Sequence, residues 1–134
     1  GEGCAPCRPT SIAGRGYLLC PDPTSWPLAQ DACAASGRAL VTIEAVEEDD
    51  ALRAAMQREF SIPQFWIGLS DRRGADVFEW PDGSEVGAYA PFVLGDPDNT
   101  PPRCVRSVND TDPAGWRDRP CADPFPFVCD EPAL

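Results

Sequence analysis

The sequence predicts an α+β domain in which two helices come early in the chain and short strands, forming antiparallel sheets, come late. Three observations support this prediction. Apolar residues recur at helical spacing in the first half and gather in short runs in the second half. Residues 84–102 show no period, which predicts one long loop within a compact domain. Seven cysteines in 134 residues predict that disulfide bonds staple the fold.

The cysteines also indicate the compartment. Cys4 and Cys7 form one CxxC motif, but no second pair follows, and the chain has no histidine. This pattern favours disulfide bonds over a zinc site, and therefore an oxidising location such as the periplasm, the cell surface or the extracellular space. No apolar run approaches the roughly 18 residues of a membrane helix, so we expect no membrane insertion. The chain begins at Gly1 without a basic and apolar leader, so we expect a mature form or an excised domain.

The net charge is −11, with 22 acidic residues against 11 basic ones. This charge repels nucleic acid and anionic lipid, so we expect neither as a partner. The acidic excess serves either solubility or the binding of a cation, and composition leaves both interpretations open. All 11 basic residues are arginine, which suggests a GC-rich genome and a bacterial origin.

The first segments are short. Residues 1–14 are rich in glycine, proline and cysteine, and they predict a terminal tail or a short hairpin. Residues 17–20 are an apolar run that ends at Pro21, which is typical of a buried strand.

A helix follows this strand. Thr24 or Ser25 can cap it, Pro27 is tolerated in its first turn, and Gly37 marks its end. Its predicted buried face consists of the apolar or small residues Trp26, Ala29, Ala32, Cys33 and Ser36.

Residues 40–43 predict a further strand. A second helix begins at the acidic run 47–50, where negative charge suits the positive end of the helix dipole, and it ends before Pro63. Its predicted apolar face consists of Ala51, Leu52, Ala55, Met56 and Phe60.

Residues 65–69 are the strongest predicted strand, residues 77–80 alternate in polarity, and residues 81–83 are a turn. After the long loop, further short strands are predicted at residues 105–108, at Trp116 and at residues 125–129. The tryptophans invite a sugar-stacking interpretation. However, each lies in an element that should be buried, so we expect the following to be core residues: Trp26, Trp66, Trp80 and Trp116.

These motifs, in this order and spacing, resemble the C-type lectin-like domain over roughly residues 15–131. We therefore expect the domain at residues 15–134, after the tail or hairpin at 1–14. The entry Tyr17-Leu18-Leu19-Cys20 looks like a variant found in secreted proteins of GC-rich bacteria. The matching features are Cys33 seven residues after Trp26, Trp66-Ile67-Gly68-Leu69, Trp80-Pro81-Asp82-Gly83, Gly95-Asp96-Pro97-Asp98-Asn99, Cys104, Trp116-x-Asp118, Cys121 and Phe127-Val128-Cys129.

The resemblance implies three disulfide bonds. It pairs Cys33 with Cys129 and Cys104 with Cys121. A further bond would join Cys20 to Cys7 or to Cys4, and we expect Cys7. The remaining Cys4 would then link to another chain, pair within a larger polypeptide or stay an ordinary thiol.

The resemblance also implies a calcium ion in the long loop, bound by hard oxygen ligands and shared with two sugar hydroxyls. Asp96 and Asp98, which flank Pro97, and Asp118 match the family's metal-ligand positions. Together with Asn99 and Arg117, they make up the predicted ligand-binding residues.

Two positions depart from the family pattern. Arg103 stands where an acid usually precedes the cysteine, and Arg117 stands where an asparagine usually precedes the aspartate. Three hypotheses remain for this loop: a calcium site with sugar recognition, a loop in which Arg103 or Arg117 replaces the metal by pairing with Asp96 or Asp98, and a solvated acidic loop without a role.

A second, structural calcium position is implied near the carbonyl of Val41, with Glu47 and Asp130 as its acidic ligands. The alternative is that Glu47 complements the helix dipole and that Asp130 is a solvated terminal acid. Both interpretations stay open.

The sequence argues against an enzyme. Without histidine the commonest general acid–base group is missing, and we expect six of the seven cysteines to be in bridges. We therefore expect an extracellular recognition module that uses the long loop to bind a glycan or a protein. The alternative is a structural subunit that self-associates into a surface layer or a fibre.

Overall fold

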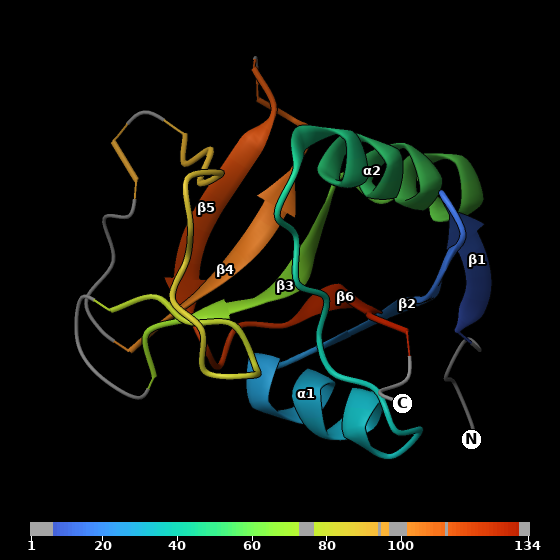
Figure 1. The fold of residues 1–134 in the computed structure, drawn as a ribbon, viewed down its shortest axis with the longest axis horizontal. Helices are drawn as coiled ribbons and strands as arrows, with labels where there is room; N and C mark the ends of the chain where they lie inside the picture. Colours follow the sequence, from blue (N-terminus) through green and yellow to red (C-terminus); the bar gives the residue numbers. More distant parts are fainter. Residues whose placement is uncertain (1–6, 73–76, 94, 97–101, 112, 132–134) are drawn as a thin grey trace.

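The computed structural model describes residues 7–72, 77–93, 95–96, 102–111 and 113–131. Six strands form one mixed sheet in the order β1-β2-β6-β3-β4-β5, and two helices pack against it (Figure 1). The elements are β1 (Arg8–Ile12), β2 (Arg15–Thr24), α1 (Trp26–Ala34), α2 (Val46–Phe60), β3 (Gln64–Ser70), β4 (Arg103–Val108), β5 (Gly115–Pro120) and β6 (Phe125–Cys129).

The sheet brings the two ends of the described chain together. β1 and β2 form an antiparallel hairpin, and β2 pairs antiparallel with the last strand, β6. The β3–β4 and β4–β5 pairs are also antiparallel, as predicted. Among the strand pairs of the described residues, only β3–β6, at the centre of the sheet, is parallel. The α+β class is therefore confirmed, with one parallel pair that sequence patterns did not indicate.

Both predicted helices form. The Ser25 side chain accepts a hydrogen bond from the Leu28 amide at 3.4 Å and so caps α1, with Pro27 in the first turn as expected. In α1 the buried residues are Trp26, Ala29 and Cys33, whereas Ala32 and Ser36 are exposed. The helix therefore buries a narrower stripe than predicted.

The second helix has acids in its first turn, as predicted, and ends at Ser61, two residues before Pro63. Ser61 adopts a left-handed conformation with φ of 57°, and its amide bonds back to the helix at Gln57. The buried face includes Leu52, Ala55 and Met56, as expected. It also includes Asp49 and Arg53, which sequence patterns did not place there.

The predicted strand at residues 40–43 is wrong. Only Leu40 forms an isolated bridge, to Cys129. Val41 donates to the Val128 carbonyl at 3.0 Å and accepts from the Gly68 amide at 2.8 Å. The segment thus divides its hydrogen bonds between β3 and β6 and builds no continuous ladder with either. The side chains of Leu40, Val41 and Ile43 are nevertheless fully buried.

Three disulfide bonds hold the described elements, and their pairs are those that the resemblance implies. Cys33–Cys129 joins α1 to β6, Cys104–Cys121 joins β4 to the segment after β5, and Cys7–Cys20 joins the amino-terminal segment to β2. The first of these spans 96 residues, and a loop of that length contributes about 4–5 kcal/mol on the chain-entropy model. Cys4 lies outside the described residues.

All four tryptophans are core residues, as predicted, and each is at most 4% exposed. Trp26 donates its indole N–H to the Ile67 carbonyl, and Trp66 donates to the Thr24 carbonyl, both at 2.8 Å. Trp116 instead donates to the buried carboxylate of Asp49 at 2.8 Å. Because all four rings are almost completely buried, their faces are not available for stacking on a sugar.

Asp49 is a polar hub inside the core, with no exposed surface. Besides Trp116, its carboxylate accepts hydrogen bonds from Tyr89 and Ser107 at 2.7 Å each and pairs with Arg53 at 2.8 Å. The hub links α2, β4, β5 and the segment that precedes the long-loop motif. A buried carboxylate needs such compensation, because an unpaired one costs several kcal/mol.

The close approach at Gly68 gives a first prediction. A Cβ added there would lie 2.7 Å from the Leu40 carbonyl oxygen, which is backbone and cannot move aside cheaply. We expect Gly68→Ala to lower the free energy of unfolding by about 1–3 kcal/mol, as overpacking does. Chemical denaturation monitored by tryptophan fluorescence measures this change.

Gly16→Ala is the matched control, because a Cβ at Gly16 meets nothing within 4 Å. Equal stabilities for the two variants would contradict the packing of the 40–43 segment against β3.

Candidate functional site

The end of the long loop lies beside β5. The Val93 amide donates to the Trp116 carbonyl at 2.9 Å, and the Trp116 amide donates to the Pro91 carbonyl at 2.9 Å. A Cβ at Gly115 would stand 2.3 Å from the Pro91 oxygen, so only glycine admits this approach. Residues 91–93 of the long loop therefore pair with the outer edge of β5, and Asp96 follows them at that strand.

Asp96 meets Arg117 there. The Arg117 Nε donates to Asp96 Oδ2 at 2.9 Å. The Asp96 side chain is 3% exposed, whereas that of Arg117 is 41% exposed. The ion pair therefore closes over the carboxylate and leaves part of the guanidinium facing solvent. This is the contact that one of the three loop hypotheses requires.

Asp118 and Arg103 lie elsewhere. Successive residues of a strand point to opposite faces, so Asp118 is 2% exposed while its neighbour Arg117 is half-exposed. Arg103 is buried and donates its Nε to Asp71 Oδ2 at 2.9 Å. Its guanidinium also stacks over the Phe78 ring at 5.0 Å. Arg103 thus ties β4 to the end of β3.

The remaining predicted loop residues, Asp98 and Asn99, lie outside the described residues. Of the predicted long-loop set, the described part of the structure brings together Asp96 and Arg117.

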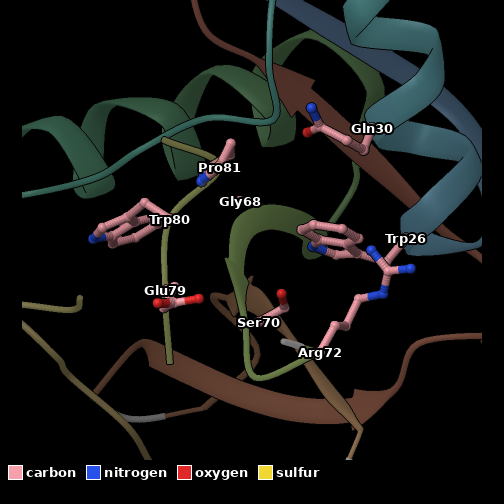
Figure 2. A pocket seen from close by; sticks show the side chains of 8 residues that line it. All are labelled: Trp26, Gln30, Gly68, Ser70, Arg72, Glu79, Trp80 and Pro81. Atoms are coloured by element: carbon pink, nitrogen blue, oxygen red, sulfur yellow. The ribbon is translucent and has the colours of Figure 1, made fainter. Parts of the chain in front are cut away.

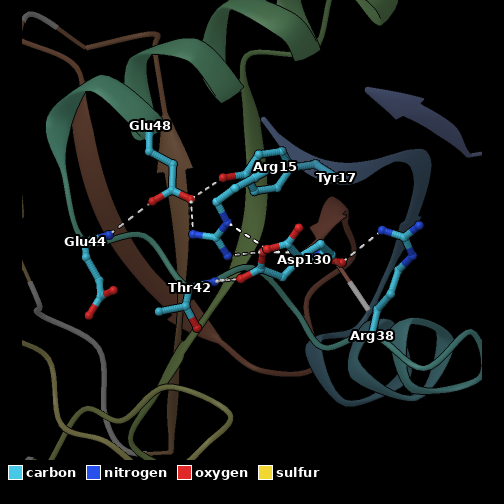
Figure 3. Close-up of polar contacts among 8 residues, drawn as sticks. Arg15, Tyr17, Arg38, Thr42, Glu44, Glu48 and Asp130 are labelled. Atoms are coloured by element: carbon cyan, nitrogen blue, oxygen red, sulfur yellow. Dashed lines mark hydrogen bonds and ion pairs between the residues drawn. The ribbon is translucent and has the colours of Figure 1, made fainter. Parts of the chain in front are cut away.

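The second implied metal position contains an arginine (Figure 3). Arg15, on β2, pairs with Asp130 at 2.7 Å, with Glu131 at 3.2 Å and with Glu48 at 3.5 Å. The Arg15 guanidinium therefore forms ion pairs with carboxylates from α2 and from the segment after β6. We call these four residues the Arg15 cluster.

Further contacts fix the Arg15 cluster. Asp130 accepts from the Thr42 amide at 3.3 Å, and its carbonyl accepts from Arg38 at 3.0 Å. Tyr17 donates its hydroxyl to Glu48. Asp130 therefore lies beside the backbone of residue 42, and Glu48, not the exposed Glu47, supplies the helix carboxylate of this cluster. Sequence reasoning missed Glu48 because adjacent acids in a helix point in different directions, and the acidic run does not show which of them faces Asp130. It missed Tyr17 because the hydroxyl of that residue bonds to Glu48.

The described residues do not fit calcium. Calcium takes six to eight oxygen ligands, whereas both implied positions place a guanidinium against the carboxylates. At 4 Å and an effective dielectric constant of 20, a unit charge repels a divalent ion by about 8 kcal/mol. Within the described ranges, no three or more His, Cys, Asp or Glu side chains gather closely enough to hold a metal ion.

A small pocket of about 180 Å³ opens between α1, the end of β3 and residues 79–81 (Figure 2). Arg72 lies over the Trp26 ring at 5.1 Å on one side, and Glu79 lies on the other. Gln30, at the rim, accepts from the Leu40 amide at 3.0 Å. The pocket is smaller than the roughly 300–1,000 Å³ typical of small-molecule sites.

The Arg15 cluster yields a prediction about calcium. Arg15→Gln removes the positive charge among three carboxylates and should destabilise the protein by about 1 kcal/mol, because the side chain is partly exposed. The three carboxylates would then lack their shared cation and would attract a divalent cation from solution. We expect calcium to raise the unfolding temperature of Arg15→Gln but not that of the wild type.

Arg8→Gln is the control, because Arg8 pairs with Glu59 on the surface and its loss changes the net charge equally. Stabilisation of the wild type by calcium, or an equal calcium effect in both variants, would refute this role for Arg15.

Both tyrosines of the chain give a pH prediction. Burial, together with hydrogen bonds to Glu48 and Asp49, raises the pKa of Tyr17 and of Tyr89 above the ordinary value of 10.0. The unfolded chain then loses these protons first, so stability falls as the pH rises beyond about 10.

We expect phenolate absorbance to appear together with the loss of the circular dichroism signal. Reversible titration of both tyrosines near pH 10 in a protein that keeps its fold would be inconsistent with these hydrogen bonds.

Comparison with known proteins identifies the family. Residues 22–131 match the family model described as the lectin C-type domain. The human C-type mannose receptor 2 is 31% identical over 128 residues, which is 92% of this chain but only 8% of the receptor. Human lithostathine-1-alpha is 34% identical over 86 residues, or 62% of this chain and 51% of that protein.

Solved structures agree with the fold. The C-type lectin CEL-I from Cucumaria echinata superposes with a TM-score of 0.81 at 24% identity, covering 94% of this chain and 96% of that one. Human lithostathine superposes with a TM-score of 0.79 at 26% identity, covering 99% and 90%. The bacterial origin suggested by the arginine usage stays a prediction. The match over most of its length shows that the chain belongs to the C-type lectin domain family.

Proposed function

We propose that this domain is a non-enzymatic recognition module that binds an extracellular glycan or protein without calcium, through the surface where the long loop meets β5. The observation that carries the proposal is the ion pair between Arg117 and Asp96. It supplies a positive charge at a carboxylate that the family pattern would assign to a metal.

The pair also suits ligand binding. The Nε of Arg117 is used by Asp96, and the two terminal nitrogens of its 41% exposed side chain remain as donors. A guanidinium held from one side by a buried acid is pre-organised, so it loses little freedom when it bonds a hydroxyl or carboxylate of a ligand.

Two residue types usual in catalytic sites, histidine and free cysteine, are absent or few in this chain. The chain has no histidine, and six of its seven cysteines are in disulfide bonds. The relatives include proteins named as a C-type mannose receptor and as a C-type lectin. A recognition role needs none of the missing groups.

The proposed location is extracellular, either secreted or at a cell surface. Three disulfide bonds among the described residues support an oxidising compartment. None of the helices in the described ranges is both long and apolar enough to cross a membrane.

The alternative, a self-assembling subunit, stays a prediction. The large hydrophobic side chains exposed in the described ranges, Leu28, Val46 and Val77, belong to three separate segments. Single exposed apolar residues are ordinary and do not indicate an assembly surface.

Glycan and protein arrays, probed in calcium and again in a chelator, test the proposal. We expect binding of equal strength in both conditions. Arg117→Ala should weaken it about tenfold or more, the effect of losing one charge-assisted hydrogen bond.

Arg58→Ala is the control, since Arg58 is exposed on α2, away from the long loop. Binding that requires calcium, or that survives Arg117→Ala unchanged, would contradict the proposal.

A further inference from the structure

Three arginines share the outer face of the β4–β5 pair. Arg106 is directly opposite Arg117 in the register, and Arg119 is two residues further along β5. Their strand neighbours Val105, Ser107, Trp116 and Asp118 point to the other face and are buried. The Phe125 ring on β6 lies beneath two of the guanidinium groups, 4.9 Å from that of Arg106 and 5.9 Å from that of Arg119. We call Arg106, Arg117, Arg119 and Phe125 the arginine face.

Arg106 differs from the other arginines in the chain's interior. Of the described arginines that are buried or partly buried, it alone makes neither a hydrogen bond nor an ion pair. The paired ones are Arg15, Arg38, Arg53, Arg103 and Arg117. The Nε of Arg106 is fully covered and has no hydrogen-bonding partner. In a chain with twice as many acids as bases, an arginine without an acid is unexpected.

The position of Arg106, partly buried and beside two other arginines, lowers the stability of the protein without a ligand. Burial and the neighbouring charges of Arg119 and Arg117 lower the pKa of Arg106. A buried polar group without a partner costs about 1–3 kcal/mol. Neither Asp96, which pairs with Arg117, nor Asp123, which pairs with Arg119 at 3.1 Å, bonds to Arg106. An acidic group on a ligand could not reach the covered Nε, but it would offset the positive charge of this guanidinium through the two terminal nitrogens, for which no bond is formed within the described residues.

We propose that the arginine face binds a single oxyanionic group, a carboxylate or sulfate ester carried on a sugar, so that the ligand of this domain is an acidic glycan. The inference rests on the proposed recognition function and specifies its ligand class. Planar guanidinium groups match carboxylate and sulfate oxygens with paired hydrogen bonds. The terminal nitrogens of Arg117 and Arg119 add donors, because their pairs with Asp96 and Asp123 are made through Nε.

The charge of the chain limits the ligand further. A net charge of −11 repels an extended polyanion, such as nucleic acid or an anionic membrane. A single acidic group is attracted by the local cluster at short range. Charges more than about 8 Å away are largely screened at physiological ionic strength. The surface therefore favours a glycan with isolated acidic groups.

A structural explanation for Arg106 competes with this one. Gln64 Oε1 is also buried without a partner, and the β3–β4 register puts Gln64 on the same face, diagonal to Arg106. A water between the two would satisfy both atoms. Arg106 would then be part of the fold, and its removal would lower stability.

The test is a two-dimensional NMR titration that follows the arginine Nε–Hε signals. The probes are glucuronate, its uncharged counterpart glucose, and inorganic sulfate. We expect glucuronate or sulfate to shift the Arg106 signal while glucose leaves it unchanged. Arg106→Gln should weaken anion binding about tenfold or more and should unfold at the same temperature as the wild type or higher.

Arg58→Gln is the matched control, because it removes the same charge from the exposed surface of α2. The inference is overturned if neither anion binds, if both variants weaken binding equally, or if Arg106→Gln unfolds at a lower temperature. Array binding of neutral glycans only, with no shift by either anion, would overturn this inference and leave the proposed function intact. If no glycan on the array binds but an anion still shifts the Arg106 signal, the anion site is supported and glycan recognition is refuted.

Discussion

The constraint on which this structure depends is that four carboxylates with little or no exposed surface each pair with a positive charge, and arginine is the only basic residue type in the chain. Asp49 and Asp71 have side chains with no exposed surface, and those of Asp96 and Asp130 are 3% and 14% exposed. Each pairs with an arginine from another turn or strand. Breaking such a pair leaves a desolvated charge, which costs about 3–5 kcal/mol in buried examples. These contacts therefore specify how α2, the sheet and the loop fit together.

The same contacts shape the functional surface. Arg15 and Arg117 are cations of the chain itself, and they pair with the acids of the Arg15 cluster and with Asp96. We propose that these acids therefore need no ion from solution. A charge that belongs to the chain cannot be lost to a chelator, and it presents hydrogen-bond donors where a metal would present open coordination positions. Arg106 is the exception to the pairing among the described buried or partly buried arginines, and this exception is the reason why we propose the arginine face as a binding surface.

Local patterns predicted the parts of the fold that depend on local chemistry. The cap at Ser25 and the stop before Pro63 follow from the backbone preferences of those residues. The disulfide pairs came from the family resemblance, because spacing alone does not select among pairings. The strand predicted at residues 40–43 was wrong because a composition rich in β-formers does not show whether a segment pairs with one neighbouring strand or with two. The pairing depends on the close approach of the Leu40 carbonyl to Gly68, and this contact exists only once the chain has folded.

The candidate site was predictable only in part, for the same reason. The acidic run at the start of α2 was understood as a complement to the helix dipole, yet Asp49 turns inward. Its i,i+4 spacing from Arg53 was the available signal. Asp96 and Arg117 could be named from the motif, but their contact depends on the loop running along β5. Arg15 lies more than 100 residues from Asp130, and no sequence pattern connects them.

The central claim is that arginine side chains of this chain take the place of bound calcium. Calorimetric titration of calcium into the intact, metal-stripped protein tests it most directly. The account predicts no saturable binding heat at millimolar calcium. Saturable binding in the micromolar range, abolished by Asp96→Ala or Asp130→Ala, would contradict it.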